Sequence, residues 1–465
     1  MNGILDRRNF LKSVGLGAVL SLQKHSPVFG HSGTPVPAGR PNIVFILTDD
    51  QRYDAMGCAG HPWLKTPHMD RLAEEGVMFK NAFVTTSLCS PSRGSFLTGC
   101  YAHFHEVFRN NGVDPKQSVP TFPEILRKAG YETAFIGKWH MARKNSPRAG
   151  FEHWVSFSGQ GRYDKNMLNV DGQTIRSDTY VTDDLTNYAV RFLKKPREKP
   201  FMLYLSHKAV HGPFAPANRH ENLYSDVEIE SRHNPEDNLD TKPPWGRKMD
   251  PNWKSQVLAY YRCLAAVDES LGRVLETLEQ IDALDNTVVI FAGDNGYFQG
   301  EHGGMWDKRA AYEPSMRIPL LMRYPRLVGP ATVCDEMVLN IDLAPSLLEL
   351  AGVPGPDTMQ GQSWLGVLKG RPGRRSFLYE YFQEADHKYK RPTILAIRTK
   401  RWKYVTYPLD DSLTCELYDM LNDPGELNNL VDSSEYSDVT ERMKKELERL
   451  KSETGFRFPE KKRIL

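Results

Sequence analysis

Short runs rich in apolar and β-branched residues recur along the chain and predict the strands of a sheet. Each run is five or six residues long, a length typical of a strand and too short for most helices. The runs show little alternation of polar and apolar positions, as is typical of strands buried on both faces of a parallel sheet. They cover residues 42–47, 132–136, 201–205 and 287–292.

Segments with the apolar spacing of helices alternate with these strands. They cover residues 69–75, 122–129, 180–194 and 254–281. This alternation predicts an α/β fold, with a large, mostly parallel sheet sandwiched between helices. A long, polar, proline-rich segment at 212–253 interrupts the pattern, and we expect it to shape a substrate cleft.

The pattern changes after residue 370. Short, evenly spaced strand candidates and one charged helix predict a small antiparallel sheet packed with a helix. The strand candidates cover residues 377–382, 394–399, 403–407 and 416–418, and the helix covers 436–453. Because 465 residues are too many for one ordinary core, we expect a large domain at 41–370 and a C-terminal α+β subdomain at 371–465.

The first 30 residues have the pattern of an export signal that is removed from the mature protein. Arg7 and Arg8 precede an apolar run that is about half the roughly 20 residues needed to span a bilayer. The pair resembles a bacterial twin-arginine signal, although an ordinary basic N-terminus would also fit. We expect a signal peptide at 1–30, a linker at 31–40, the twin-arginine translocase as a partner, and a periplasmic or extracellular location without a transmembrane anchor.

Composition narrows the possible classes of function. Apolar residues make up 40% of the chain and charged residues 25%, as in soluble globular proteins. The 60 basic and 58 acidic residues nearly cancel, which argues against a nucleic-acid-binding surface. The six cysteines show neither a Cys-x-x-Cys pair nor zinc-ligand spacing, and the sequence leaves their pairing open.

Polar and charged residues follow directly after the predicted strands. Asp49 and Asp50 follow the first strand, and Asp294 and Asn295 follow the fourth. In an open α/β sheet the carboxyl ends of the strands meet at one edge, where ligands bind. Oxygen-only donors suit a hard cation such as calcium or magnesium and argue against zinc. Taken alone, Asp49 and Asp50 could equally form a cap or turn.

The segment at 85–99 carries the most specific motif in the chain. Cys89 and Arg93 stand in a Cys-x-Pro-x-Arg pattern that is followed by Leu-Thr-Gly. Together with the opening Pro-Asn-Ile-Val-Phe-Ile-Leu-Thr-Asp-Asp-Gln, the motif resembles the type I sulfatases of the alkaline phosphatase superfamily, over residues 41 to about 430. The resemblance implies a formylglycine-generating maturation enzyme that oxidises Cys89 to Cα-formylglycine. It also implies one calcium ion bound by Asp49, Asp50, Asp294 and Asn295.

Motifs elsewhere in the chain match the same family. Arg93 lies one helical turn after Cys89 if a helix begins near the cysteine, and would then point back at it. The resemblance implies that Arg93 helps to position the reactive group and the metal. The reaction also needs a proton acceptor, and imidazole titrates in the right range. By resemblance, the remaining contacts with the sulfate and the reactive group come from Lys138, His140, His211 and Lys308. His207 and Arg309 are the competing candidates for the roles of His211 and Lys308.

An aldehyde would give this chemistry a release step that a hydroxyl or a thiol lacks. The hydrated aldehyde is a geminal diol, and one of its hydroxyls attacks sulfur while the alcohol leaves. The second hydroxyl then loses its proton and expels sulfate by C–O cleavage, so water need not attack a crowded, anionic sulfur. A divalent cation in the same site would lower the pKa of the diol.

The expected substrate is a sulfated carbohydrate. Segments at 204–211, 294–298 and 378–382 resemble bacterial sulfatases that act on sulfated glycans. Among these, the resemblance favours the N-acetylglucosamine-6-sulfatase and mucin-desulfating groups. We expect the His-Phe-His-Glu segment at 103–106 to line the cleft. Five residues could hold a sugar or belong to the core or a hinge: Tyr163, Tyr297, Tyr379, Glu380 and Tyr381.

Two other interpretations stay open. A phosphonate monoester or phosphodiester hydrolase shares the fold and the formylglycine with the sulfatases. A non-catalytic binder of sulfated glycans would instead carry an unmodified Cys89.

Overall fold

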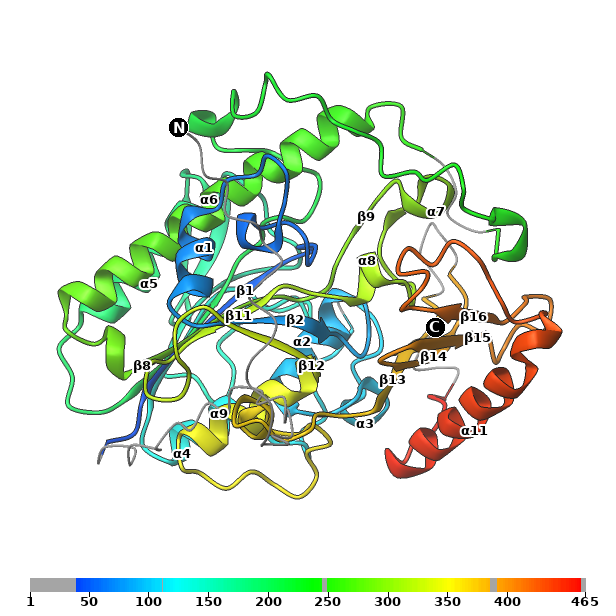
Figure 1. Cartoon of the computed structure of the whole chain (residues 1–465). Helices are drawn as coiled ribbons and strands as arrows, with labels where there is room; N and C mark the ends of the chain where they lie inside the picture. Colours follow the sequence, from blue (N-terminus) through cyan, green and yellow to red (C-terminus); the bar gives the residue numbers. More distant parts are fainter. Residues whose placement is uncertain (1–38, 111, 245–248, 385–390, 461–465) are drawn as a thin grey trace, which may run out of the picture. The chain divides into compact units, whose positions relative to one another are not determined.

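The computed structural model describes residues 39–110, 112–244, 249–384 and 391–460, which belong to one compact unit. Its largest element is a ten-stranded mixed sheet in the order β12-β2-β11-β8-β1-β7-β3-β4-β5-β6 (Figure 1). The strands of this sheet are β1 (Asn42–Thr48), β2 (Val77–Phe83), β3 (Glu132–Lys138), β4 (His153–Phe157), β5 (Asn166–Val170), β6 (Gln173–Ser177), β7 (Phe201–Ser206), β8 (Thr287–Gly293), β11 (Leu320–Arg323) and β12 (Thr332–Leu339). The expected export signal and most of the expected linker lie outside the described residues.

The centre of the sheet is parallel. β1 pairs with β7 on one side and β8 on the other, and β7 pairs in turn with β3. In this register Leu47 lies opposite both Ser206 and Ala292. The carboxyl ends of the four predicted strands therefore meet at one edge, as the strand-end argument requires.

The two faces of the sheet carry separate hydrophobic cores, and β1 contributes to both. Ile43, Phe45 and Leu47 point into one core, whereas Val44 and Ile46 point into the other. All five side chains are fully buried, which explains why the sequence of this strand shows no alternation.

Helices cover both faces of the sheet, so the predicted fold class is confirmed (Figure 1). The first core includes residues of α2, α4 and α9, and the second includes residues of α1, α5 and α6. The helices are α1 (Pro67–Glu74), α2 (Cys89–Thr98), α3 (Ala102–His105), α4 (Phe122–Lys128), α5 (Val181–Lys194), α6 (Trp253–Gln280), α7 (Glu301–Gly304), α8 (Glu313–Met316), α9 (Leu343–Leu350), α10 (Leu365–Leu368) and α11 (Ser437–Glu453).

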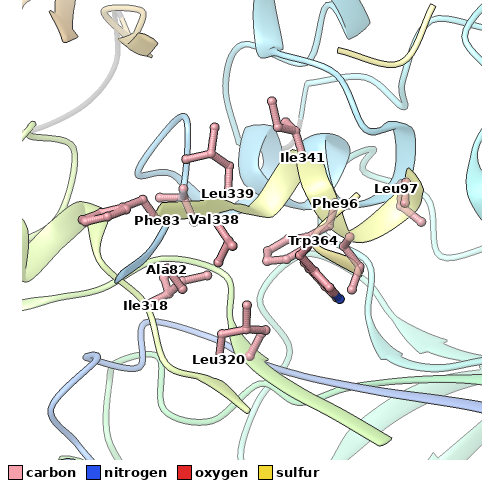
Figure 2. Packing of buried hydrophobic residues seen from close by; sticks show 14 of the residues in the cluster. Ala82, Phe83, Phe96, Leu97, Ile318, Leu320, Val338, Leu339, Ile341 and Trp364 are labelled. Atoms are coloured by element: carbon pink, nitrogen blue, oxygen red, sulfur yellow. The ribbon is translucent and has the colours of Figure 1, made fainter. Parts of the chain in front are cut away.

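The first core also supports the helix that begins at Cys89. Figure 2 shows Phe96 and Leu97 of α2 in this core, and the Phe96 ring packs against Phe45 of β1 with ring centres 5.5 Å apart. At Gly94 a Cβ atom would lie 2.8 Å from the His105 ring, so glycine is needed for α2 to pack this closely against α3. All ten residues of α2 are buried, so the helix is packed against the rest of the protein on every side.

A four-stranded antiparallel sheet with α11 forms the C-terminal part, as predicted. It consists of β13 (Ser376–Tyr381), β14 (Ile394–Thr399), β15 (Trp402–Thr406) and β16 (Glu416–Asp419), and a separate two-stranded ribbon joins β9 (Phe298–Gln299) to β10 (Trp306–Asp307). Glu380 of β13 connects this sheet to the segment between β2 and α2, because its amide donates a hydrogen bond to Thr85 O at 2.9 Å.

Several residues considered for substrate contact belong to the interior instead. Tyr379, Glu380 and Tyr381 are fully buried, which fits the core alternative. His103 donates its amide to the Glu380 carboxylate, and its Nδ1 lies 2.7 Å from that carboxylate. The His105 ring packs on α2, with Nε2 3.1 Å from Ser95 Oγ. The expectation that residues 103–106 line the cleft is therefore wrong for both histidines.

Candidate active site

The carboxyl ends of β1 and β8 bring the acidic residues together. The Asp294 amide donates to Thr48 O at 2.9 Å, and the Asp50 amide donates to Asp294 Oδ1 at 3.0 Å. Asp49 and Asn295 complete the group, and all four side chains are buried. One oxygen from each of the three carboxylates, together with the sulfur of Cys89, lies within 4.8 Å of every other.

Cys89 is the first residue of α2 and faces this cluster. Its Sγ lies 3.4 Å from Asp49 Oδ1, and the residue is fully buried. Burial, and next the negative charge of Asp49, raise the pKa of the thiol well above its ordinary value. A thiol in this environment stays protonated and is a poor nucleophile, so the position does not suit ordinary cysteine catalysis.

Arg93 lies one turn along α2 and links the ends of four strands. Its Nε donates to Asp294 Oδ2 at 2.9 Å, and Nη2 lies 3.5 Å from Asp49 Oδ2. Its Nη1 donates to Lys138 O at 2.7 Å and to Ser206 Oγ at 2.6 Å. The guanidinium therefore fixes the carboxylates of β1 and β8 relative to β3 and β7.

Two lysines complete the ring of cations. Lys138 ends β3 and donates to Asp49, and Lys308 follows β10 and donates to Asp50. Arg309, the competitor of Lys308, is turned away: its Nε donates to Glu384 at 2.6 Å and its Nη1 to Asp307 at 2.8 Å. Geometry therefore favours Lys308 for the role at the sulfate.

Two histidines, His211 and His140, lie beside this cluster. His211 Nε2 lies 3.7 Å from Asp50 Oδ2, whereas His207 Nε2 lies 3.2 Å from Ser270 Oγ of α6, away from the cluster. Both ring nitrogens of His140 are buried and find no hydrogen-bond partner among the described residues. Burial lowers the pKa of His140 and of His211 well below the ordinary value, so the site favours the neutral form of both rings.

The pKa values of the three carboxylates shift in different directions because their neighbours differ. Burial alone would raise the pKa of Asp49, but Lys138 and the other cations hold it well below its usual range. Burial raises the pKa of Asp50 to about 7 despite Lys308. Burial, and next the charge of Asp49, also raise the pKa of Asp294. Carboxylates crowded in this way favour a bound cation that would offset their repulsion.

The donor set fits a hard metal ion. Each of the candidate ligands offers oxygen, and Asn295 Oδ1 is buried without a hydrogen-bond partner among the described residues. Oxygen-rich sites suit calcium or magnesium rather than zinc or copper. The residues that would hold the ion are Asp49, Asp50, Asp294 and Asn295.

The structure thus brings every residue predicted for the site to one edge of the sheet, while the roles of these residues stay predictions. It also adds two polar residues that the sequence did not reveal. Gln160, just beyond β4, accepts a hydrogen bond from Lys138 Nζ. Lys208 is buried beside His211. Neither stands in a motif whose pattern signals its burial.

Two of the tyrosines considered for sugar binding lie near this cluster. Tyr163 is 5% exposed, and its hydroxyl donates to His211 O at 3.0 Å. Tyr297 is half-buried and packs against Phe214, Tyr260 and Trp306. No helix in the described part of the chain is both long and apolar enough to cross a membrane.

Comparisons with known proteins agree with this geometry. The sulfatase family model matches residues 41–353, and the model for the C-terminal part of N-sulphoglucosamine sulphohydrolase matches residues 300–453. An N-acetylglucosamine-6-O-sulfatase of Bacteroides thetaiotaomicron is 33% identical over an alignment of 493 positions, gaps included, that covers 89% of this chain and 86% of the relative.

Solved structures give the same result. A protein in complex with its substrate, D-glucosamine-2-N,6-O-disulfate, has a TM-score of 0.82 at 30% identity, covering 90% of this chain and 98% of the other. A phosphonate monoester hydrolase of Agrobacterium radiobacter has a TM-score of 0.73 at 21% identity, covering 89% of this chain and 96% of the other, and so shares the fold. From its sequence match and its structural neighbours, the chain belongs to the sulfatase family and is a sulfuric ester hydrolase.

Proposed function

We propose that this sulfatase removes the 6-O-sulfate of N-acetylglucosamine, or of a related residue, from sulfated glycans. The proposed nucleophile is a formylglycine made from Cys89 and the proposed metal is one calcium ion. The observation that carries the proposal is the contact of Cys89 Sγ with Asp49, at 3.4 Å, inside a cluster of buried carboxylates and cations.

The side chains around Cys89 suit a two-step reaction, in which a diol at this position first cleaves the sulfate ester and then releases sulfate. In the first, one diol hydroxyl loses its proton and forms a bond to sulfur, while the bond between sulfur and the ester oxygen breaks. We assign Lys308, which pairs with Asp50 in the cluster, to the leaving oxygen, because a cation there would stabilise its developing charge. The released alcohol takes up a proton.

In the second step the remaining hydroxyl gives up its proton and the carbonyl re-forms. The bond from carbon to the sulfated oxygen breaks, and sulfate leaves with both electrons of that bond. We assign His140 as the acceptor of this proton, because both of its ring nitrogens are buried without a partner among the described residues. A bound calcium ion would supply positive charge that favours the deprotonated diol.

The choice of substrate rests on relatives. One is named an N-acetylglucosamine-6-O-sulfatase, and another was solved with a disulfated glucosamine. A phosphonate monoester hydrolase is the second candidate, because such an enzyme shares the fold. The identity to it is only 21%, so the likeness concerns the fold alone.

A direct comparison of esters separates these candidates. We expect the matured enzyme to release sulfate from N-acetylglucosamine-6-sulfate. We also expect kcat/KM for an aryl sulfate to exceed that for the matching aryl phosphonate by at least about 100-fold, because the phosphonate has a carbon substituent in place of one peripheral oxygen and so loses hydrogen bonds that a sulfate would accept. Initial rates of sulfate and phenol release measure both. A preference for the phosphonate would contradict the proposal.

We also propose that the enzyme is exported in folded form by the twin-arginine route. The proposal rests on Arg7 and Arg8 and on the complete burial of Cys89. A maturation enzyme cannot reach a buried residue, so oxidation must precede folding and therefore export.

Replacing both arginines with lysine is expected to keep the protein in the cytoplasm, fully active once cells are lysed, because the arginine pair is the transport signal. Activity in separated periplasmic and cytoplasmic fractions measures the effect. Unchanged export of the double variant would refute this route.

A further inference from the structure

Lys208 differs from the other buried lysines of the protein. Five lysines are buried in the described part of the chain, and four of them pair with carboxylates. Lys208 is only 2% exposed, yet no carboxylate of the described residues lies within ion-pair distance of its ammonium. The four pairs are Lys138 with Asp49, Lys242 with Asp237, Lys308 with Asp50, and Lys403 with Glu426.

The ammonium of Lys208 is directed at the backbone of His211. Its Nζ donates to His211 O at 3.4 Å and lies 4.6 Å from the centre of the Tyr163 ring. The Tyr163 hydroxyl donates to the same oxygen at 3.0 Å, and the His211 amide donates back to Lys208 O at 3.0 Å. Lys208 and Tyr163 thus hold the turn that carries the His211 ring.

Such a charge is costly to bury and needs a reason. Burial, and next the charge of Lys138, lower the pKa of Lys208 to about 8. The fold therefore disfavours the charged ammonium instead of stabilising it. A methionine in this place would cost less, so the lysine is explained by function better than by stability.

We propose that Lys208 is a positioning residue for sulfate-ester hydrolysis. With the Tyr163 hydroxyl it fixes the His211 carbonyl, so that the imidazole stays beside Asp50. Its uncompensated positive charge also favours the sulfate anion in the pocket. The inference rests on the proposed role of His211 at the sulfate.

Paired substitutions test this role. In Lys208→Met, we expect kcat for an aryl sulfate to fall about 10- to 100-fold, because a small displacement of a binding group has effects of this size. We expect the dissociation constant of inorganic sulfate, measured by calorimetry, to rise about 10-fold for the same reason. The melting temperature should stay equal or rise, since an unpaired buried charge is removed.

Two controls separate charge and position from a general loss of structure. Lys208→Arg keeps the charge and should retain kcat within about 3-fold of wild type. Lys444→Met removes a half-exposed lysine of α11 and should change neither rate nor sulfate affinity. Should Lys208→Met not fold, Tyr163→Phe removes only the hydroxyl and should lower kcat about 3-fold at an unchanged melting temperature.

Three results of these experiments would overturn the role proposed for Lys208. Rate and sulfate affinity of Lys208→Met within twofold of wild type would overturn the proposal. The proposal would also be overturned if Lys208→Met and Lys208→Arg lost kcat and sulfate affinity equally and both had a lower melting temperature. Lys208 would then be needed for the structure and not for its charge and position. If Tyr163→Phe has to be used instead, an unchanged kcat would also overturn the proposal. A wild-type enzyme that fails to hydrolyse aryl sulfates would instead contradict the proposed function, and the sulfate affinities would still decide the role of Lys208.

Discussion

Replacing Cys89 with alanine is expected to lower kcat for sulfate-ester hydrolysis by about 10⁵-fold or more, to the background rate. A methyl group can be neither oxidised to an aldehyde nor hydrated, so no covalent intermediate forms, and removal of a nucleophile has effects of this order. The fold should survive, because α2 stays anchored by Phe96 and Leu97 in the core. Steady-state rates with an aryl sulfate measure the loss, and circular dichroism checks the fold.

Two related variants show whether the loss is specific. Cys89→Ser places one hydroxyl at the start of α2, which suffices for attack but not for release. It should give at most one equivalent of alcohol and then stop, with the sulfate ester retained on the protein. Cys100→Ala changes another buried cysteine just after the same helix and should leave the rate near wild type. Full turnover by Cys89→Ala would remove the basis of the mechanism.

Replacing Asp294 with asparagine is expected to lower kcat by about 10³-fold and to abolish calcium binding. The carboxylate accepts hydrogen bonds from Arg93 Nε and from the Asp50 amide, so it orients both the guanidinium and the neighbouring ligand. The amide keeps the shape but loses the charge, and a hard cation depends on charged oxygen donors. Metal content of the purified protein and its melting temperature with and without calcium measure the effect.

A second buried carboxylate serves as the control for Asp294. Asp268 of α6 is buried as well, and burial raises its pKa to about 6, but it accepts the amides of His68 and Met69, outside the cluster. Asp268→Asn should therefore keep the metal and the activity, whatever it does to stability. Normal calcium content in Asp294→Asn would exclude this residue from the metal site.

The central strands could be predicted because their sequences carry a strong signal. β1, β3, β7 and β8 are buried on both faces and read as continuous apolar runs, and the structure confirms each of them. β11 gave no such signal, since it has only four residues. Its place between β2 and β8 is set by contacts with strands that are distant in sequence.

The site was predictable to the extent that it follows from strand ends. Asp49, Asp50, Asp294 and Lys138 come together because the strands before them are neighbours in a parallel sheet. Lys208 could not be found in this way. Whether a lysine is solvated or buried without a carboxylate depends on packing around it, and the sequence does not show that packing.

The mass of the peptide that contains residue 89 tests the account most directly. The protein should be produced together with a formylglycine-generating enzyme, digested, and analysed by mass spectrometry alongside its sulfatase activity. We predict a peptide about 18 Da lighter than the cysteine form, which reacts with a hydrazine probe, in an amount that scales with activity. An active preparation in which Cys89 is entirely an unmodified thiol would contradict the account.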